Sequence, residues 1–264
     1  MPSLLLDGRP AAVVGKPVPL KILPVLDLLD GVVVRGVAGQ RDSYRPVESC
    51  LVDSADPLAV AEAFRRQLGL SELYLADLDA ILHGTRNLEL IGTLAERGFS
   101  LLVDAGLNSA ASTRAVLDSG AAAAVTGLET LTDPALLGQL VNQWGPERVV
   151  FSLDLKCGQP LTAISRWRNV PPLEIVREAA GLGVSRLIVL DLAQVGLEEG
   201  LSTLPLCRQI RRELPELELI TGGGISDGAD LQPLQHEPVD GLLVATALHR
   251  GRMTRDDIQR YSAQ

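Results

Sequence analysis

Short apolar runs alternate along the chain with longer stretches in which apolar residues follow helical spacing. An uninterrupted apolar run is typical of a strand buried on both faces, as in a parallel sheet covered by its crossover helices. Such runs lie at 22–26, 73–76, 101–103, 121–125, 149–153, 187–190, 217–220 and 241–244. Eight runs separated by helical stretches favour an α/β fold, the closed (β/α)8 or TIM barrel, over an open sheet.

Two of the helical stretches begin with the same start signal. Asp56-Pro57 and Asp133-Pro134 each place an N-cap side chain before a proline of the first turn, and apolar residues at helical spacing follow. The segment 35–54 differs, because it is polar and too long for an ordinary loop between a strand and a helix. Loops of this length in compact domains are often functional.

An internal repeat divides the chain into two halves. The correspondences are 24–28 with 151–155, 104–108 with 222–226, and 125–128 with 245–248. A repeat of this size predicts two fused half-barrels of four strands each, related by approximate twofold symmetry. We therefore expect residues 21–264 to form a single barrel domain, preceded by an N-terminal extension at 1–20.

Asp27 and Asp154 occupy equivalent places in the repeat, each at the end of an apolar run. The C-terminal ends of barrel strands carry the active site, so the two carboxyl groups are expected to face each other across the barrel mouth. A neutral carboxyl group can donate a proton while an ionised one removes a proton. A single aspartate at such a position more often caps the following loop, but the symmetric pair favours catalysis.

A phosphate site is predicted in the second half. Gly222, Gly223 and Gly224 follow a strand and precede a helix, where backbone N–H groups can hold an anion without lysine. Ala245 and Thr246, after the eighth run, are placed to form the second wall. The alternative is a glycine turn needed only for tight packing.

The equivalent site in the first half is degraded. Asp104 replaces the first glycine, and its charge would repel a phosphate, so it is expected to be catalytic or to bind a polar or cationic group. Gly106 and Thr126 are what remains of that site. The pattern therefore predicts one good phosphate site, not two.

Three further residues are candidates for the site. Asp191 ends the sixth run and is either a rim residue or a hydrogen-bonded cap. Arg35 begins the long loop and is either a clamp for a carboxylate or phosphate or a solvated side chain. Trp167, between Arg166 and Arg168, is placed to close over a planar ligand.

Composition narrows the possible partners. With 264 residues, 46% of them hydrophobic, the chain can bury one large core, and its net charge of −9 argues against nucleic-acid binding. No apolar stretch reaches the length of a membrane span. The three cysteines lie far apart, without metal-ligand spacing, so we expect no metal, no disulfide framework and a reducing cytoplasm.

The segment 24–35 resembles the opening of the HisA/HisF histidine-biosynthesis barrels. The similarity extends over nearly the whole chain and includes 77–80, Asn87, Asp154, the triple glycine and 245–251. It implies a phosphorylated small-molecule substrate, no cofactor, and an Amadori rearrangement of an aminoaldose to an aminoketose. By this resemblance Asp154 protonates the ribose ring oxygen and Asp27 removes the proton from the neighbouring carbon.

The chain departs from that family at two places. Residues 104–108 replace a glycine-rich loop, and 190–196 lack a threonine and a second aspartate that the family carries. These changes resemble a separate branch associated with methanopterin-type one-carbon cofactors. The open alternatives are a HisA-type isomerase, a derived relative with another phosphorylated substrate, a non-catalytic phosphate-binding barrel, and a HisF-like cyclase supplied with ammonia by a glutaminase. Homo-oligomerisation is also left open.

Overall fold

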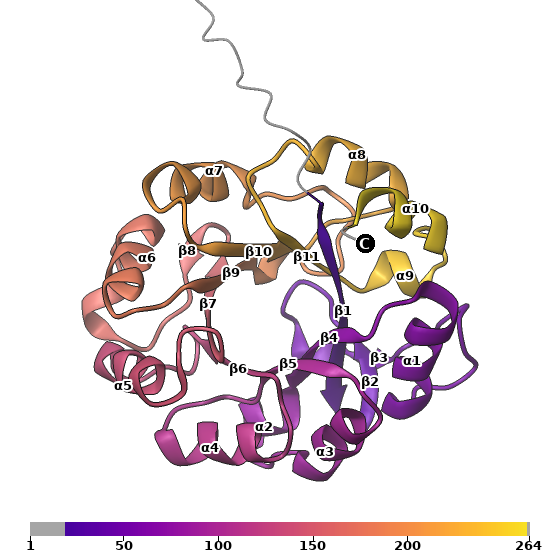
Figure 1. Cartoon of the computed structure of the whole chain (residues 1–264), viewed down its shortest axis with the longest axis horizontal. Coiled ribbons are helices and arrows are strands. Elements are labelled where there is room, and N and C mark those ends of the chain that lie inside the picture. Colours follow the sequence, from indigo (N-terminus) through magenta and orange to yellow (C-terminus); the bar gives the residue numbers. More distant parts are fainter. Residues whose placement is uncertain (1–18, 263–264) are drawn as a thin grey trace, which may run out of the picture.

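Eight parallel strands close into a barrel in the computed structural model, which describes residues 19–262 (Figure 1). The barrel strands are β1 (Lys21–Leu29), β4 (Glu72–Asp77), β5 (Ser100–Asp104), β6 (Ala123–Gly127), β7 (Val149–Lys156), β9 (Arg186–Asp191), β10 (Glu218–Gly222) and β11 (Gly241–Val244). Parallel pairing of β11 with β1 closes the ring. The predicted (β/α)8 barrel is confirmed, and each predicted run overlaps one barrel strand.

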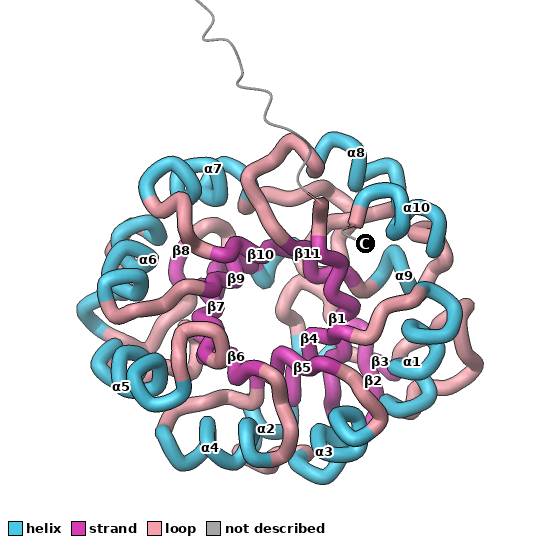
Figure 2. Tube along the Cα trace, in the orientation of Figure 1, coloured by secondary structure: helices cyan, strands magenta, loops and turns pink. Residues whose placement is uncertain are grey.

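Helices surround the ring of strands (Figure 2). They are α1 (Pro57–Ala63), α2 (Leu78–His83), α3 (Leu88–Glu96), α4 (Ala110–Asp118), α5 (Pro134–Trp144), α6 (Pro172–Gly181), α7 (Leu204–Glu213), α8 (Leu231–Leu234), α9 (Thr246–His249) and α10 (Arg255–Tyr261). The predicted caps are confirmed. Asp56 accepts a hydrogen bond from the Ala59 N–H at 2.8 Å, and Asp133 accepts one from the Ala135 N–H at 2.9 Å.

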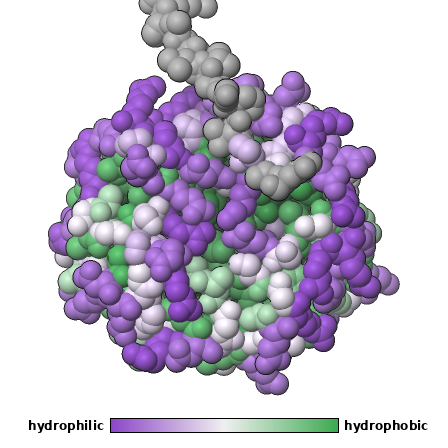
Figure 3. Space-filling model, viewed as in Figure 1, coloured by the Kyte–Doolittle hydropathy of each residue, from purple (hydrophilic) through white to green (hydrophobic). Residues whose placement is uncertain are grey.

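The predicted N-terminal extension, 1–20, lies outside the described residues except for 19 and 20. Leu20 is fully buried, and its N–H donates to the Tyr261 carbonyl at 3.0 Å. Residue 20 therefore packs with the barrel domain. In the view of Figure 3, hydrophilic residues form most of the outer rim, and hydrophobic residues show mainly toward the middle.

Each half of the barrel carries an antiparallel hairpin after its first strand. β2 (Val32–Arg35) pairs with β1, and β8 (Gln159–Pro160) pairs with β7. Both turns have two residues with positive φ, 53° and 74° at Asp30-Gly31 and 53° and 75° at Cys157-Gly158, the conformation of tight hairpin turns. The long segment predicted as a loop therefore begins inside β2, and it contains a short strand, β3 (Arg45–Pro46), paired with β2.

The strand register repeats between the two halves. Asp27 lies opposite Ala76 as Asp154 lies opposite Leu190, and Asp104 lies opposite Val125 as Gly222 lies opposite Leu243. This repetition supports the division into two half-barrels. It corrects one correspondence, however, because 125–128 matches 243–246 in register rather than 245–248.

Successive side chains of each strand point alternately into the barrel and toward the helices. Inside the barrel lies a dry cluster that includes Leu23, Leu102, Val150 and Ile220. Continuing the alternation toward the C-terminal ends turns Asp104 and Gly222, two residues beyond members of that cluster, and Asp27 and Asp154, four residues beyond members of it, toward the barrel interior on alternate strands. Three acids and one glycine thus occupy inward positions above the cluster.

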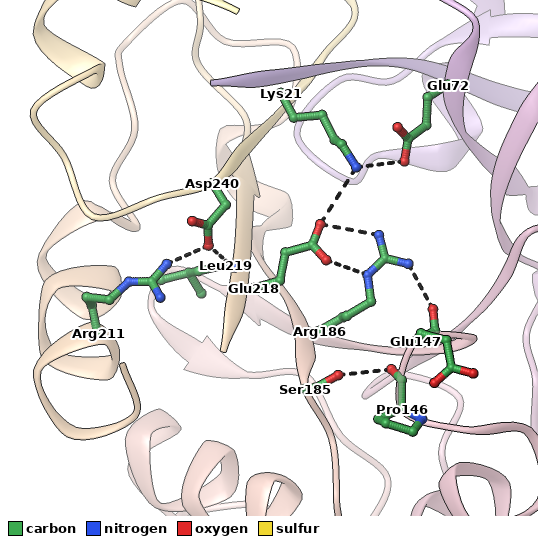
Figure 4. A network of polar contacts seen from close by, with 10 residues as sticks. All are labelled: Lys21, Glu72, Pro146, Glu147, Ser185, Arg186, Arg211, Glu218, Leu219 and Asp240. Atoms are coloured by element: carbon green, nitrogen blue, oxygen red, sulfur yellow. Dashed lines mark hydrogen bonds and ion pairs between the residues drawn. The ribbon is translucent and has the colours of Figure 1, made fainter. Parts of the chain in front are cut away.

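Ion pairs close the opposite end of the barrel (Figure 4). Lys21 lies 3.0 Å from Glu72 and 3.9 Å from Glu218, and Arg186 lies 2.7 Å from Glu218. All four residues stand at the N-terminal ends of strands. Arg186 is the most buried member, with 14% of its side chain exposed.

We expect Arg186→Met to lower the free energy of unfolding by about 1–2 kcal/mol, because Glu218 would keep its charge at the barrel floor with a weaker partner. Urea unfolding of the variant and the wild type measures the change. The matched control is Arg177→Met, which removes the exposed Arg177–Glu213 pair and should leave stability unchanged. Equal effects of the two substitutions would contradict a special role for the floor.

Candidate active site

A cavity of about 420 Å³ opens at the C-terminal ends of the strands. Eight of the predicted site residues line it, namely Asp27, Arg35, Asp104, Asp154, Gly223, Gly224, Ala245 and Thr246. This is the end of the barrel where active sites are built. The cavity therefore brings both predicted catalytic acids and the predicted phosphate loop into one space.

The three inward-facing acids, Asp27, Asp104 and Asp154, differ in their hydrogen bonds. Asp154 accepts from the Ser152 hydroxyl at 2.7 Å and from the Glu129 N–H at 3.3 Å. Asp104 accepts from the Gly106 N–H at 3.2 Å and from the Tyr74 hydroxyl at 3.4 Å. The carboxyl group of Asp27 accepts no hydrogen bond from the part of the chain that the structure describes. Asp154 is thus held in place, whereas Asp27 is free to bond to a ligand.

Burial raises the pKa of all three acids toward neutrality. The pKa of Asp27 rises to about 7, although the charge of Arg41 lowers it in part. The pKa of Asp104 also rises to about 7, through burial and the nearby charge of Asp154. The pKa of Asp154 reaches about 6, because its hydrogen-bond donors stabilise the ionised form. Near pH 7 these groups can give or take protons, as acid–base chemistry requires.

Asp191 does not reach the cavity. It lies one position beyond the inward-facing residues of β9, so its side chain points away from the barrel interior. Its carboxylate accepts from the N–H groups of Cys157 at 3.0 Å, Gly158 at 2.7 Å and Ala193 at 3.0 Å. Of the two roles that the sequence left open for Asp191, rim residue or hydrogen-bonded cap, the structure supports the second: Asp191 caps the following 3-10 turn and anchors the β7–β8 turn.

The glycine loop after β10 presents backbone to the cavity. Gly223 and Gly224 have φ values of 83° and 101°, and a Cβ on Gly224 would collide with the Gly200 carbonyl. Within residues 19–262, the N–H groups of Gly224 and Ile225 donate to no acceptor. Gly222 does not line the cavity, because a Cβ there would lie 2.7 Å from that of Leu243. Gly222 instead allows β10 and β11 to pack closely.

The equivalent loop in the first half is closed to the cavity. Gly106 has a φ of 61°, and a Cβ on it would lie 3.0 Å from the Ile81 Cα, while the next residue, Leu107, is fully buried. Thr126 is also fully buried, and the alternation along β6 turns its side chain toward the helices. The predicted contribution of Gly106 and Thr126 to a ligand site is therefore corrected.

Trp167 belongs to the core and not to a lid. Only 1% of it is exposed, its ring centroid lies 6.4 Å from that of Phe151, and its indole N–H donates to Glu178 at 2.7 Å. The prediction that it closes over a planar ligand is corrected. Arg35 differs, because its side chain is exposed at the edge of the cavity.

Two residues of the cavity wall were missed by the sequence reasoning. Arg41 in the long segment after β2 forms a bidentate ion pair with Glu129 after β6, with N–O distances of 2.9 and 2.6 Å. The N–H of Ala38 donates to the Val195 carbonyl at 2.7 Å, so the segment also reaches the loop after β9. These contacts hold the segment across part of the barrel mouth. The length of the segment indicated a functional role, but no sequence pattern indicated Arg41 in particular.

Residues 19–262 contain no group of three or more His, Cys, Asp or Glu side chains arranged to hold a metal ion. No helix in this part of the chain is long and apolar enough to cross a membrane.

The raised pKa values predict that the folded state loses stability as the pH rises. The pKa of Asp104 goes from 3.8 in the unfolded chain to about 7, so the folded protein keeps a proton that the unfolded chain has released. The resulting penalty is absent below about pH 4 and complete above about pH 8. One unit of pKa corresponds to about 1.4 kcal/mol, so Asp104→Asn should be more stable than the wild type by roughly 2–4 kcal/mol at pH 8.

At pH 3.5 the same variant and the wild type should be about equally stable, because both are uncharged at this position. Urea unfolding at the two pH values makes the comparison. A stability difference that does not change with pH would show that the pKa of Asp104 is the same in the folded and the unfolded protein, which would contradict the raised value.

The fold and the carboxyl-lined cavity define an α/β barrel with a site suited to proton transfer on a small molecule. A family model described as "Histidine biosynthesis protein" matches residues 21–254. The chain belongs to this family, which confirms the resemblance found in the sequence.

Named relatives cover nearly the whole chain. An uncharacterized protein of Methanocaldococcus jannaschii is 32% identical over 244 residues, 90% of this chain and 97% of the relative. A 1-(5-phosphoribosyl)-5-((5-phosphoribosylamino)methylideneamino) imidazole-4-carboxamide isomerase of Moorella thermoacetica is also 32% identical over 244 residues, 89% of this chain and 96% of the relative. The isomerase of the same name from Parabacteroides distasonis is 26% identical over 249 residues, 92% of this chain and 100% of the relative.

Proposed function

We propose that the protein is an isomerase of the HisA type that converts a phosphorylated aminoaldose, or a related phosphorylated small molecule, by acid–base chemistry. The observation that carries the proposal is the convergence of Asp27 and Asp154 on one cavity, from equivalent strands of the two halves, with pKa values of about 7 and about 6. Family membership and relatives named as isomerases support the same chemistry.

Asp154 is the proposed general acid. In its neutral form it donates a proton to the sugar ring oxygen while the bond from that oxygen to C1 breaks, and the nitrogen on C1 becomes a protonated Schiff base. The hydrogen bonds from Ser152 and the Glu129 N–H fix the direction of its carboxyl group. A fixed acid needs little reorganisation when the ring opens.

Asp27 is the proposed general base. Its ionised carboxyl group takes the proton from C2, and the resulting enaminol becomes the aminoketose by gaining a proton at C1 and losing one from its C2 hydroxyl. In the free protein burial raises the pKa of both acids toward neutrality, so the two roles depend on what the bound substrate does to each carboxyl group. The cationic Schiff-base nitrogen next to C2 lowers the pKa of Asp27 after ring opening, and so makes it the base at the step that needs one.

The phosphate of the substrate is proposed to bind at the other side of the cavity. Gly223 and Gly224 on one wall and Ala245 and Thr246 on the other line the cavity. The unused N–H groups of Gly224 and Ile225 and the first turn of α9 supply hydrogen-bond donors there. Such an anchor holds the sugar at a fixed distance from the two acids.

One observation favours a derived relative over the reaction named for the known isomerases. The substrate in their printed name carries two phosphoribosyl groups. In this chain the loop equivalent to the phosphate loop, around Gly106 and Leu107, does not line the cavity. The proposed substrate therefore carries one phosphate rather than two.

We expect Asp27→Asn and Asp154→Asn each to lower kcat by at least about a hundredfold, since each removes one proton-transfer group. The measurement is exchange of the C2 hydrogen of phosphorylated aldoses with deuterated water, together with turnover of the two-phosphate imidazole-carboxamide substrate. Asp77→Asn is the control, because Asp77 is a buried helix cap that accepts from the Ala80 N–H at 3.1 Å. Full exchange in Asp27→Asn would remove Asp27 as the base.

A second pair of variants tests the phosphate anchor. Thr246→Asp places a negative charge beside the proposed phosphate, while Thr246→Asn has the same size without the charge. We expect the aspartate variant to bind ribose 5-phosphate at least about tenfold more weakly than the asparagine variant at low ionic strength. Titration calorimetry measures both affinities. Equal affinities would place the phosphate elsewhere.

A further inference from the structure

The two sides of the cavity have opposite chemistry. The side built by the second half presents the backbone of Gly223, Gly224 and Thr246. The opposite side presents the carboxyl groups of Asp104 and Glu129, which belong to the first half, and of Asp154, which lies on the first strand of the second half. The register places Asp104 and Gly222 at equivalent positions of the repeat. An acid thus stands where the phosphate-binding half has a glycine.

Asp104 and Asp154 face the same small space. Their Oδ2 atoms lie 3.3 and 3.0 Å from the point where a Cβ on Gly127 would stand. Arg41, on the wall of the same cavity, is held by Glu129 in a bidentate pair. A phosphate entering this space would meet two carboxyl groups and no free arginine, whereas a cation would be attracted by both.

The packing of the barrel does not account for the charge of Asp104. Its two hydrogen bonds are long, 3.2 Å from the Gly106 N–H and 3.4 Å from the Tyr74 hydroxyl, and an asparagine oxygen could accept both. No Lys or Arg side chain within residues 19–262 forms an ion pair with it. Burying a carboxylate without a cationic partner is costly, and such a cost is typical of functional sites.

We propose, on the basis of the proposed function, that Asp104 is a specificity-determining residue: it selects substrates that carry a cationic nitrogen group, such as an ammonium, at the end opposite their phosphate. Binding of such a ligand places its charge between Asp104 and Asp154 and compensates their buried charges. The same residue rejects a second phosphate. The protein thus differs from a barrel with two phosphate sites through the side chain at one symmetric position.

Matched phosphate esters test this inference by titration calorimetry at pH 8. The probes are ω-aminoalkyl phosphates, the corresponding alkyl phosphates and the corresponding alkane bisphosphates, each with two to five methylene groups. At the best-fitting length, we expect the amine to bind at least about tenfold more tightly than the alkyl phosphate, as a charge-assisted hydrogen bond to a buried carboxylate would provide. The bisphosphate should bind more weakly than either.

Asp104→Asn should remove the advantage of the amine, leave alkyl phosphate affinity within about twofold, and bring bisphosphate affinity up to that of the alkyl phosphate. Asp53→Asn on the exposed surface is the matched control and should behave as the wild type. If Asp104→Asn does not fold, wild-type protein at pH 5.5 replaces it. Protonation of Asp104, which faces Asp154, Glu129 and Tyr74, should then reduce the advantage of the amine several-fold.

Each outcome separates this inference from the proposed function. If alkyl phosphates bind and the amine gives wild-type protein no higher affinity, the selective role of Asp104 is wrong but the phosphate anchor stands. The same conclusion follows if Asp104→Asn still binds the amine more tightly than the alkyl phosphate. The selective role of Asp104 is also wrong if the wild type binds the bisphosphate more tightly than the other two probes. If no phosphate ester binds, both the anchor and the role of Asp104 are wrong.

Discussion

The site depends on the alternation of side chains along parallel strands that are buried on both faces. On β1, β5 and β7 an aspartate points inward near the C-terminal end of the strand, so three carboxyl groups meet above a dry core. On β4 and β9, Asp77 and Asp191 each lie one position beyond an inward-facing residue. They therefore point outward and accept backbone hydrogen bonds instead. A shift of one residue separates a group that can act on a substrate from one that only holds a turn.

The same alternation explains how far the sequence could predict the site. Strands covered on both faces are apolar at every position, so the eight runs could be located but their inward faces could not. Asp27 and Asp154 were found because the repeat pairs them at strand ends. Thr126 was misassigned, and the role of Asp191 was left open, because nothing in a continuous apolar run tells which residues face the cavity. Trp167 was misassigned because its burial depends on Phe151 and Glu178, which the chain brings to it only on folding.

Other features differ in how much local signal they carry. Asp30-Gly31 between two apolar segments is a hairpin signal, so β2 could have been predicted within the segment assigned to a loop. The Arg41–Glu129 pair joins residues 88 positions apart, and no local pattern indicates it. The conformation of a tight turn is determined by adjacent residues, so the sequence can predict it. A contact across the barrel mouth forms only when the ring of strands closes.

The two halves keep one backbone register and differ in the chemistry placed on it. Equivalent positions carry Asp27 and Asp154, which makes the acid pair symmetric, but also Asp104 and Gly222, which makes the ligand surroundings asymmetric. The carboxyl group of Asp104, at the position where the second half has a glycine, adds a negative charge to the cavity wall and disfavours anions there. Because the sheet hydrogen bonds involve only the backbone, this exchange leaves the barrel intact while it changes which substrate the barrel can hold.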